Sequence, residues 1–192
     1  WKTWVPIEQA TMAYGHGISV SLMQMARAYQ VFASDGEIRP VTFTKLVAPL
    51  PGKHVIKPET ARAVRKMLEM VTQPGGTATR AQVLGYRVAG KTGTSRKLEG
   101  GQYVKKYVAS FVGFAPVSDP RLIVAVMIDE PGGAKHYGGD VAGPVFSAVM
   151  GGSLRAMGVA PDQPAHAQLG ASGLQVAHGV GAVATANVKE RL

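Results

Sequence analysis

The sequence contains no cysteine and no long hydrophobic run. Without cysteine there is no disulfide, no thiolate nucleophile and no cysteine-based metal site. The longest apolar run, residues 122–128, has the length of a strand and falls well short of the roughly eighteen residues that a membrane span needs. Neither an initiator methionine nor a basic-then-apolar leader precedes Trp1. We therefore expect an internal or processed segment, with any membrane anchor outside these residues.

Acidic residues are also scarce, with 12 Asp and Glu against 21 Lys and Arg, which gives a formal net charge of +9. This balance suits an anionic partner: nucleic acid, lipid headgroups or an acidic cell-wall polymer. The basic doublets are scattered, however, and only Lys105-Lys106 has aromatic neighbours. Nucleic-acid binding is therefore disfavoured. With 192 residues, 46% of them hydrophobic, the chain is expected to form one domain.

The stretch Lys91-Thr92-Gly93-Thr94 combines a cation, two hydroxyls and a position without a side chain. Residues 86–90 before it and 107–114 after it predict two strands of a hairpin, interrupted at Gly100 and Gly101. On a strand, Lys91 and Gly93 share one face, and the two threonines share the other. Twist or a bulge at Gly93 would bring the ammonium and a hydroxyl around one ligand. Such a strand is suited to grip a substrate carboxylate and to pair with an extended peptide.

The same residues admit a second interpretation, because Gly85 to Thr92 match the phosphate-loop pattern G-x-x-x-x-G-K-[ST]. A phosphate loop must open a helix whose N-terminal amides face the phosphates. Here Gly93, Gly100 and Gly101 and a strand-like run follow Lys91, so no stable helix fits. The pattern therefore favours a strand and disfavours nucleotide binding.

The rest of the chain predicts three helices and one more strand. The helices are expected at about 19–36, 58–71 and 141–157, and the strand at 122–128, whose continuous hydrophobicity is typical of a central strand covered on both faces. The adjacent acids Asp129 and Glu130 and the basic helix face of Arg62, Arg65 and Lys66 are interpreted as solvated. Residues 161–192 are rich in Ala, Gly and Val without periodicity, and we expect a disordered tail.

Five motifs, in their order along the chain, resemble a known family. They are Tyr14-Gly15-His16-Gly17, Gly75-Gly76-Thr77-Ala78, Val88 to Thr94, Ala109 to Ala115, and Asp129-Glu130-Pro131 followed by Tyr137-Gly138-Gly139. Together, over residues 4 to 162, they resemble the C-terminal half of the transpeptidase domain of class B penicillin-binding proteins. The closest resemblance is to the division-specific D,D-transpeptidases of the FtsI type.

The resemblance implies an α+β fold, with an antiparallel β-sheet flanked by helices, of which the chain holds the C-terminal half. It also implies that a serine attacks the D-Ala-D-Ala bond of a peptidoglycan stem peptide and passes the acyl group to a neighbouring amine. Beta-lactam antibiotics acylate the same serine. No cofactor or metal is implied.

Site residues follow from the resemblance one by one. Lys91 is implied as the catalytic residue that polarises the site and assists proton transfer. Thr92 and Thr94 would bind the carboxylate of the substrate or drug, and Gly93 would keep the strand approachable. Tyr107, His136 and Tyr137 would form an aromatic wall at the rim, with Arg96 nearby.

The chain departs from the family in one respect: none of its serines stands in a Ser-x-x-Lys or Ser-x-Asn pattern. The family's order places both motifs before Trp1. We therefore expect the parent protein to be the enzyme and this segment to supply one wall of its site. For the parent, the resemblance implies an inner-membrane location on the periplasmic face, with divisome membrane proteins as partners.

Two other functions remain open. A serine beta-lactamase shares Lys-Thr-Gly but hydrolyses the acyl-enzyme rapidly. A non-catalytic module would bind anionic wall polymers or divisome proteins through its +9 charge, and salt would weaken that binding.

Overall fold

The computed structural model describes residues 3, 5–13, 15 and 17–163. Two segments named above therefore lie in whole or in part outside the described residues: the motif that contains Tyr14 and His16, and residues 164–192 of the expected tail. None of the described helices is long and apolar enough to cross a membrane.

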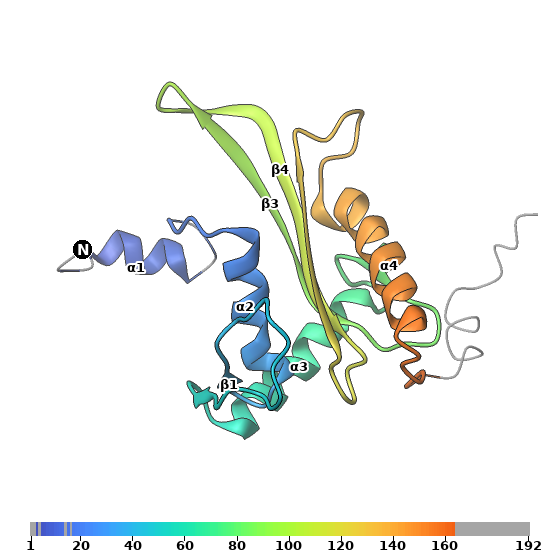
Figure 1. Ribbon diagram of the computed structural model, residues 1–192. Coiled ribbons are helices and arrows are strands. Elements are labelled where there is room, and N and C mark those ends of the chain that lie inside the picture. The colour runs from blue at the N-terminus through green and yellow to red at the C-terminus, as the bar shows by residue number, and fades with distance from the viewer. Residues whose placement is uncertain (1–2, 4, 14, 16, 164–192) are drawn as a thin grey trace, which may run out of the picture.

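A three-stranded antiparallel sheet in the order β3-β4-β5 forms the centre of the fold (Figure 1). Its strands are β3 (Ala89–Glu99), β4 (Gln102–Ala115) and β5 (Leu122–Asp129). The predicted hairpin is confirmed, and its two strands meet in a two-residue turn. Both turn residues, Gly100 and Gly101, have positive φ values of 58° and 80°. This is the conformation of a type I′ turn, in which glycine avoids the strain that a side chain would cause.

Helices cover both faces of the sheet (Figure 1). On one face lies α4 (Gly138–Ala156), and on the other lie α2 (Leu22–Ala33) and α3 (Pro58–Glu69). Shorter elements complete the described chain: α1 (Pro6–Met12), β1 (Glu37–Ile38), β2 (Lys53–His54), and the 3₁₀ turns η1 (Met70–Thr72) and η2 (Thr79–Ala81). The expected α+β architecture, with an antiparallel sheet flanked by helices, is confirmed.

Local signals explain where the long helices begin and end. Ser21 and Gln24 form a capping box at the start of α2, in which each side chain bonds the other residue's backbone N–H. The helix ends before Asp35 and Gly36, which have φ values of 49° and 91°. Proline occupies the first position of α3, where its missing N–H is not needed.

Two hydrophobic clusters hold the layers together. Between the sheet and α4, the rings of Phe111 and Phe146 meet edge to face with centroids 4.7 Å apart, and Met150 and Leu154 are fully buried beside them. On the opposite face, Phe114 is buried against Tyr29 and Phe32 of α2 and Leu68 of α3. Phe111 and Phe114 come from the same strand, so β4 is the strand that anchors both clusters.

Three expectations about the strands need correction. β5 lies at the edge of the described sheet, where it pairs with β4 alone, and helices cover both of its faces as expected. Register is continuous from Ala89 to Arg96, so there is no bulge at Gly93, and the irregularity falls between Arg96 and Leu98. The first strand starts at Ala89, not Tyr86, because Tyr86 instead bridges back to Val83.

Expectations about the helices also need correction. α4 begins at Gly138, three residues before the predicted start. Gly138 and Gly139 are poor helix formers, and their place is explained by the close packing that they allow. Arg62 and Arg65 of α3 are not merely solvated, since both pair with Asp35 at the end of α2. α1 and the β1-β2 pair lack a sequence signal strong enough to be predicted.

The first residues of the expected tail are hydrogen-bonded to the loops that flank the sheet. Asp162 accepts hydrogen bonds from the backbone N–H of Arg87 at 2.7 Å and from the N–H and hydroxyl of Ser118. Gln163 donates its backbone N–H to Gly85. The structure describes three residues past the predicted boundary at residue 160, and two of them form these hydrogen bonds. The disorder expected for residues 164–192 stays a prediction.

Candidate functional site

The Lys91-Thr92-Gly93-Thr94 stretch lies on β3, whose outer edge has no partner strand among the described residues. Ala89 packs into the cluster on the α2 side, so Lys91 and Gly93, two and four residues further on, face the same side. The Lys91 side chain is exposed, and its Nζ donates to the Thr92 carbonyl at 3.1 Å. The lysine therefore holds an accessible positive charge beside a free strand edge.

Thr92 and Thr94 face the α4 side of the sheet. The hydroxyl of Thr92 lies 3.1 Å from that of Thr77, and the hydroxyl oxygen of Thr94 accepts the backbone N–H of Gly138 at 3.0 Å. A cavity of about 330 Å³ opens here, lined by Thr77, Thr92, Thr94, Tyr137, Gly138, Gly139 and Asp140. The N-terminus of α4 adds positive potential to a cavity that already contains three threonine hydroxyls.

Glycine allows the close approach of the elements at this site. A Cβ on Gly93 would lie 2.5 Å from the hydroxyl oxygen of Ser110, its partner on β4. A Cβ on Gly138 would collide with the carbonyl oxygens of Ser110 and Gly93, and one on Gly139 with the carbonyl of Thr77. The first turn of α4 can therefore rest against β3 only without side chains at these positions.

An aromatic row follows Thr94 along the sheet. His136 stacks on Tyr107 with ring centroids 4.0 Å apart and planes 19° from parallel, and its ring lies 4.5 Å from that of Tyr137. On β3, the guanidinium of Arg96, the register partner of Tyr107, lies 5.9 Å from the centroid of that ring. The structure thus brings together all three aromatic residues that the sequence indicates, with Arg96 beside them.

Ion pairs connect the far end of β3 to the end of β5. Lys97 Nζ lies 3.0 Å from Asp129 and 2.8 Å from Glu130, so these acids are paired, although they remain partly exposed. The hydrogen bond from Lys97 is the main cause that lowers the pKa of Glu130, and the hydrogen bond to Glu130 is the main cause that raises the pKa of Lys97. Both groups are therefore charged near neutral pH, which leaves Glu130 unsuited to act as a general acid.

The sequence indicated Thr77 and the Gly138 amide only as members of motifs, without a role. A Gly-Gly-Thr loop and a Tyr-Gly-Gly sequence were the available signals. These signals do not reveal that both segments meet β3, because that contact depends on tertiary packing. Among the described residues, no group of three or more His, Cys, Asp or Glu side chains is placed to bind a metal.

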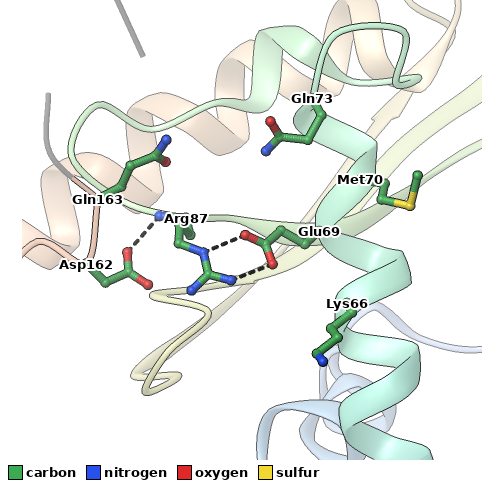
Figure 2. A pocket seen from close by; sticks show the side chains of 7 residues that line it. All are labelled: Lys66, Glu69, Met70, Gln73, Arg87, Asp162 and Gln163. Atoms are coloured by element: carbon green, nitrogen blue, oxygen red, sulfur yellow. Dashed lines mark hydrogen bonds and ion pairs between the residues drawn. The ribbon is translucent and has the colours of Figure 1, made fainter. Parts of the chain in front are cut away.

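A second, larger recess of about 450 Å³ lies away from the threonine cavity, between α3, η1 and the chain that leads into β3. Figure 2 shows the bidentate ion pair between Arg87 and Glu69 at its centre, with Asp162 accepting the Arg87 amide. The pair raises the pKa of Arg87, chiefly through the Glu69 hydrogen bond. Its central charges satisfy one another, so the recess is a structural joint between α3 and the lead-in to β3.

Comparison with known proteins shows the family to which the chain belongs. The family model for the penicillin binding protein transpeptidase domain matches residues 1–151. The chain belongs to the penicillin-binding-protein transpeptidase family. The recognition made from the sequence motifs is confirmed.

The sequence of this chain is similar to those of curated peptidoglycan D,D-transpeptidases. It is 53% identical over 165 residues to the "Probable peptidoglycan D,D-transpeptidase PenA" of Neisseria flavescens. This match covers 85% of this chain and 41% of the relative. The chain is 44% identical over 162 residues to the "Peptidoglycan D,D-transpeptidase FtsI" of Escherichia coli K12, covering 84% and 28%. The chain thus spans less than half the length of these relatives.

A solved structure agrees with the fold. The apo transpeptidase domain of Burkholderia pseudomallei penicillin-binding protein 3 is 56% identical and superposes with a TM-score of 0.78. The match covers 85% of this chain and 50% of that domain. The family's penicillin-binding fold is therefore shown for this chain. The roles of Lys91, Thr92, Gly93, Thr94, Tyr107, His136 and Tyr137 stay predictions.

Proposed function

We propose that this chain is the C-terminal part of the transpeptidase domain of a peptidoglycan D,D-transpeptidase of the FtsI type. It supplies the Lys-Thr-Gly strand, and a serine carried by the rest of the domain attacks the D-Ala-D-Ala bond. This attack releases the terminal D-Ala and leaves the stem peptide as an ester on the serine. An amine of a neighbouring stem peptide then takes over the acyl group and frees the serine, and beta-lactams acylate the same serine. The named activities of the relatives support this proposal, and the geometry of β3 carries it.

The decisive observation is the hydrogen bond from the Gly138 amide to Thr94. Because the hydroxyl oxygen of Thr94 already accepts this N–H, its own proton is free to be donated to a substrate carboxylate. Thr92 and Thr77 share one hydrogen bond between their two hydroxyls, which leaves one further proton for donation. Two oriented hydroxyls beside a helix N-terminus suit the C-terminal carboxylate of a peptide or the carboxylate of a beta-lactam.

Lys91 has a different task because it faces the other side of β3. Its ammonium is exposed, and the hydrogen bond to the Thr92 carbonyl is the one polar contact found for it among the described residues. There it stabilises negative charge that develops on the attacking serine and the scissile carbonyl, and assists the transfer of the serine proton. The free edge of β3 pairs with the extended peptide, while the row from Tyr107 to Tyr137 forms the rim.

The proposal includes the cellular setting of the parent protein. We propose that it works in septal wall synthesis at the periplasmic face of the bacterial inner membrane, anchored by a segment outside these residues, with divisome membrane proteins as partners. The FtsI name of the Escherichia coli relative supports this setting.

The test is the intact mass of the complete protein before and after incubation with benzylpenicillin. We expect one drug equivalent to be gained on a serine outside this chain. In Lys91→Ala, acylation should fall by about 10²–10³-fold, the usual effect of removing one charge-stabilising group. The stability of the protein should change little, because a site-lining lysine is not part of the core. Lys105→Met, which removes an exposed lysine of the same hairpin, is the matched control and should acylate normally.

Other outcomes would support the competing functions. Rapid release of hydrolysed drug would indicate a beta-lactamase. Absence of any adduct, together with wall binding that weakens in salt, would indicate a non-catalytic module. Unchanged acylation of Lys91→Ala would remove Lys91 from the mechanism.

A further inference from the structure

The hairpin formed by the ends of β3 and β4 projects beyond the rest of the sheet (Figure 1). β5 ends at Asp129, opposite Val108, so residues 102–107 of β4 have only β3 as a partner among the described strands. The register between the two strands shifts between Arg96 and Leu98, where Lys97 lies. Lys97 thus stands at the junction between the sheet body and the projecting arm.

Lys97 connects this junction to the end of β5. Its Nζ lies between the carboxylates of Asp129 and Glu130, at 3.0 Å and 2.8 Å, and its side chain is only 28% exposed. Lys106, on the neighbouring strand, lies 3.8 Å from Glu130 and pairs at 2.9 Å with Glu99. Two cations from the arm therefore converge on Glu130.

Glu130 has an unusual backbone conformation for its residue type. Its φ of 48° lies in the left-handed region, which non-glycine residues adopt only when their surroundings hold them there. Its N–H donates to the carbonyl of Tyr107 at 2.9 Å, and its side chain bonds Lys97. Side-chain and backbone contacts together therefore fix the direction in which the chain leaves β5.

The segment that follows Glu130, residues 131–137, carries the rim of the proposed site. It contains Gly132 and Gly133, where a Cβ would meet nothing within 4 Å, so the middle of the segment is free of packing contacts at these two positions. Its other restraints are Pro131 at its start and the ion pair of Lys135 with Asp140 at 3.3 Å near its end. At its end, His136 stacks on Tyr107, and the Gly138 amide bonds Thr94. The position of these groups depends on how the segment starts, and Lys97 and Glu130 fix that start.

We propose that Lys97 and Glu130 are positioning residues, whose ion pair holds segment 131–137 so that His136 covers Tyr107 and the start of α4 reaches Thr94. Neither residue need touch the substrate. The effect on acylation rests on the proposed function, whereas the effect on the position of His136 does not.

The size of each effect separates positioning from simple stabilisation. Ion pairs between partly exposed side chains contribute little to folding, because solvent screens them. A displacement of about 1 Å in a reacting assembly, in contrast, is enough to lower a rate by up to about 100-fold. Loss of Lys97 should therefore change the site much more than the stability of the protein.

The first experiment measures the second-order rate of acylation of the complete protein by a fluorescent penicillin. Lys97→Met keeps the aliphatic stem and should lower the rate by about tenfold, within the range expected for misplaced site groups. Lys97→Arg keeps the charge and should restore most of the rate. Lys105→Met is the matched control, since among the described residues no ion pair of Lys105 is found, and its rate should equal that of the wild type.

A second readout follows His136 directly by NMR of histidine-labelled protein, with His136→Gln used for assignment. In the wild type, stacking on Tyr107 should shift the His136 ring protons upfield, and Lys97→Met should remove much of that shift while Lys97→Arg retains it. Glu130→Gln should shift the signal in the same direction as Lys97→Met, and the two effects should be less than additive in the double variant, because both substitutions remove the ion pair between these residues.

The outcomes are distinguishable. A wild type that is not acylated would defeat the proposed function, while the NMR shifts would still test positioning. An unmoved His136 signal in both Lys97→Met and Glu130→Gln would overturn the positioning role. A moved signal with an unchanged acylation rate would overturn its link to the site.

Discussion

The two faces of the sheet are built differently. On the α4 face, Phe111, Phe146, Met150 and Leu154 are completely shielded from solvent. On the α2 side, a smaller cluster around Phe114 is accompanied by exposed apolar side chains. These are Ile7 at 68%, Ile18 at 61%, Val20 at 43%, Leu22 at 43% and Met23 at 51% exposure. α4 also leaves Val145 and Val149 exposed, at 42% and 47%, but its layer against the sheet is filled. The α2 side presents a longer series of exposed apolar side chains, which isolated soluble domains rarely leave open.

The contacts that hold the helices in place also differ between the two faces. α4 is held by aromatic and aliphatic burial, whereas α2 and α3 are also tied by charge: Asp35 pairs with Arg62 at 2.7 Å and with Arg65 at 2.5 Å, and Arg65 Nε bonds the Phe32 carbonyl. Lys91 faces the incompletely covered side. We infer that the α4 face gives the described residues most of their stability and, under the proposed function, that the rest of the transpeptidase domain covers the α2 face.

The largest expected effect on stability comes from a substitution in the hydrophobic layer between the sheet and α4. Phe146→Ala should lower the free energy of unfolding by about 3–5 kcal/mol, because it leaves a cavity beside Phe111 that the tightly packed layer cannot fill. Chemical denaturation of the complete transpeptidase domain measures this loss. Phe146→Leu, which keeps most of the apolar volume, is the control and should cost less. A loss below about 1 kcal/mol for Phe146→Ala would contradict the view that this face is the stable one.

A smaller effect on stability compares the two faces of the sheet at two apolar residues of similar exposure. Met23 on α2 is 51% exposed and Val149 on α4 is 47% exposed. In the complete domain, Met23→Ser should lower the free energy of unfolding by about 1 kcal/mol, a fraction of the value for burying a whole methionine side chain, since further chain covers it there. Val149→Ser should change it by less than about 0.5 kcal/mol.

The same two variants in a segment of residues 1–163 give the matching control. There Met23→Ser should be close to neutral and should reduce aggregation, because the apolar surface of the α2 side remains in solvent. Equal destabilisation by both variants in the complete domain would mean that the α2 face is not covered.

The smallest effect concerns pH and the charged joint between α2 and α3. The Arg62 hydrogen bond, followed by the charges of Arg65 and Arg62, lowers the pKa of Asp35 below its usual 3.8 in spite of some burial. A lowered folded-state pKa means that this contribution is fully present above about pH 4 and is lost as the pH falls through the folded value. Asp35→Asn should therefore be less stable than the wild type at pH 7, with the difference shrinking below about pH 4.

Thermal unfolding of both proteins across pH 2.5 to 7 measures that difference. Thr60→Ser on α3 is the control, because it changes an exposed residue without altering any titratable group, and its difference from the wild type should show no such step. A gap between Asp35→Asn and wild type that stays constant to pH 2.5 would exclude Asp35 as the source of the dependence.

Much of the fold follows from local patterns. The hairpin is encoded by alternating residues around Gly100 and Gly101, and α2 and α3 are encoded by apolar periodicity with Ser21 and Pro58 at their starts. The start of α4 escaped prediction because Gly138 and Gly139 are poor helix formers, and their reason for being there is contact with β3 and Thr77. The place of β5 at the end of the described sheet escaped it because strand order is not a local property.

By itself, the sequence determined the motif on β3, the hairpin that displays it, the positive charge and the family. Only the tertiary structure decided that the Gly138 amide meets Thr94 across 44 residues, that Lys97 holds Glu130, and that one face of the sheet is closed while the other is partly bare. The physical reason is the range of the interactions. Turns, caps and periodicity act over a few neighbouring residues, whereas contacts between distant side chains exist only after sheet register and helix packing have placed them.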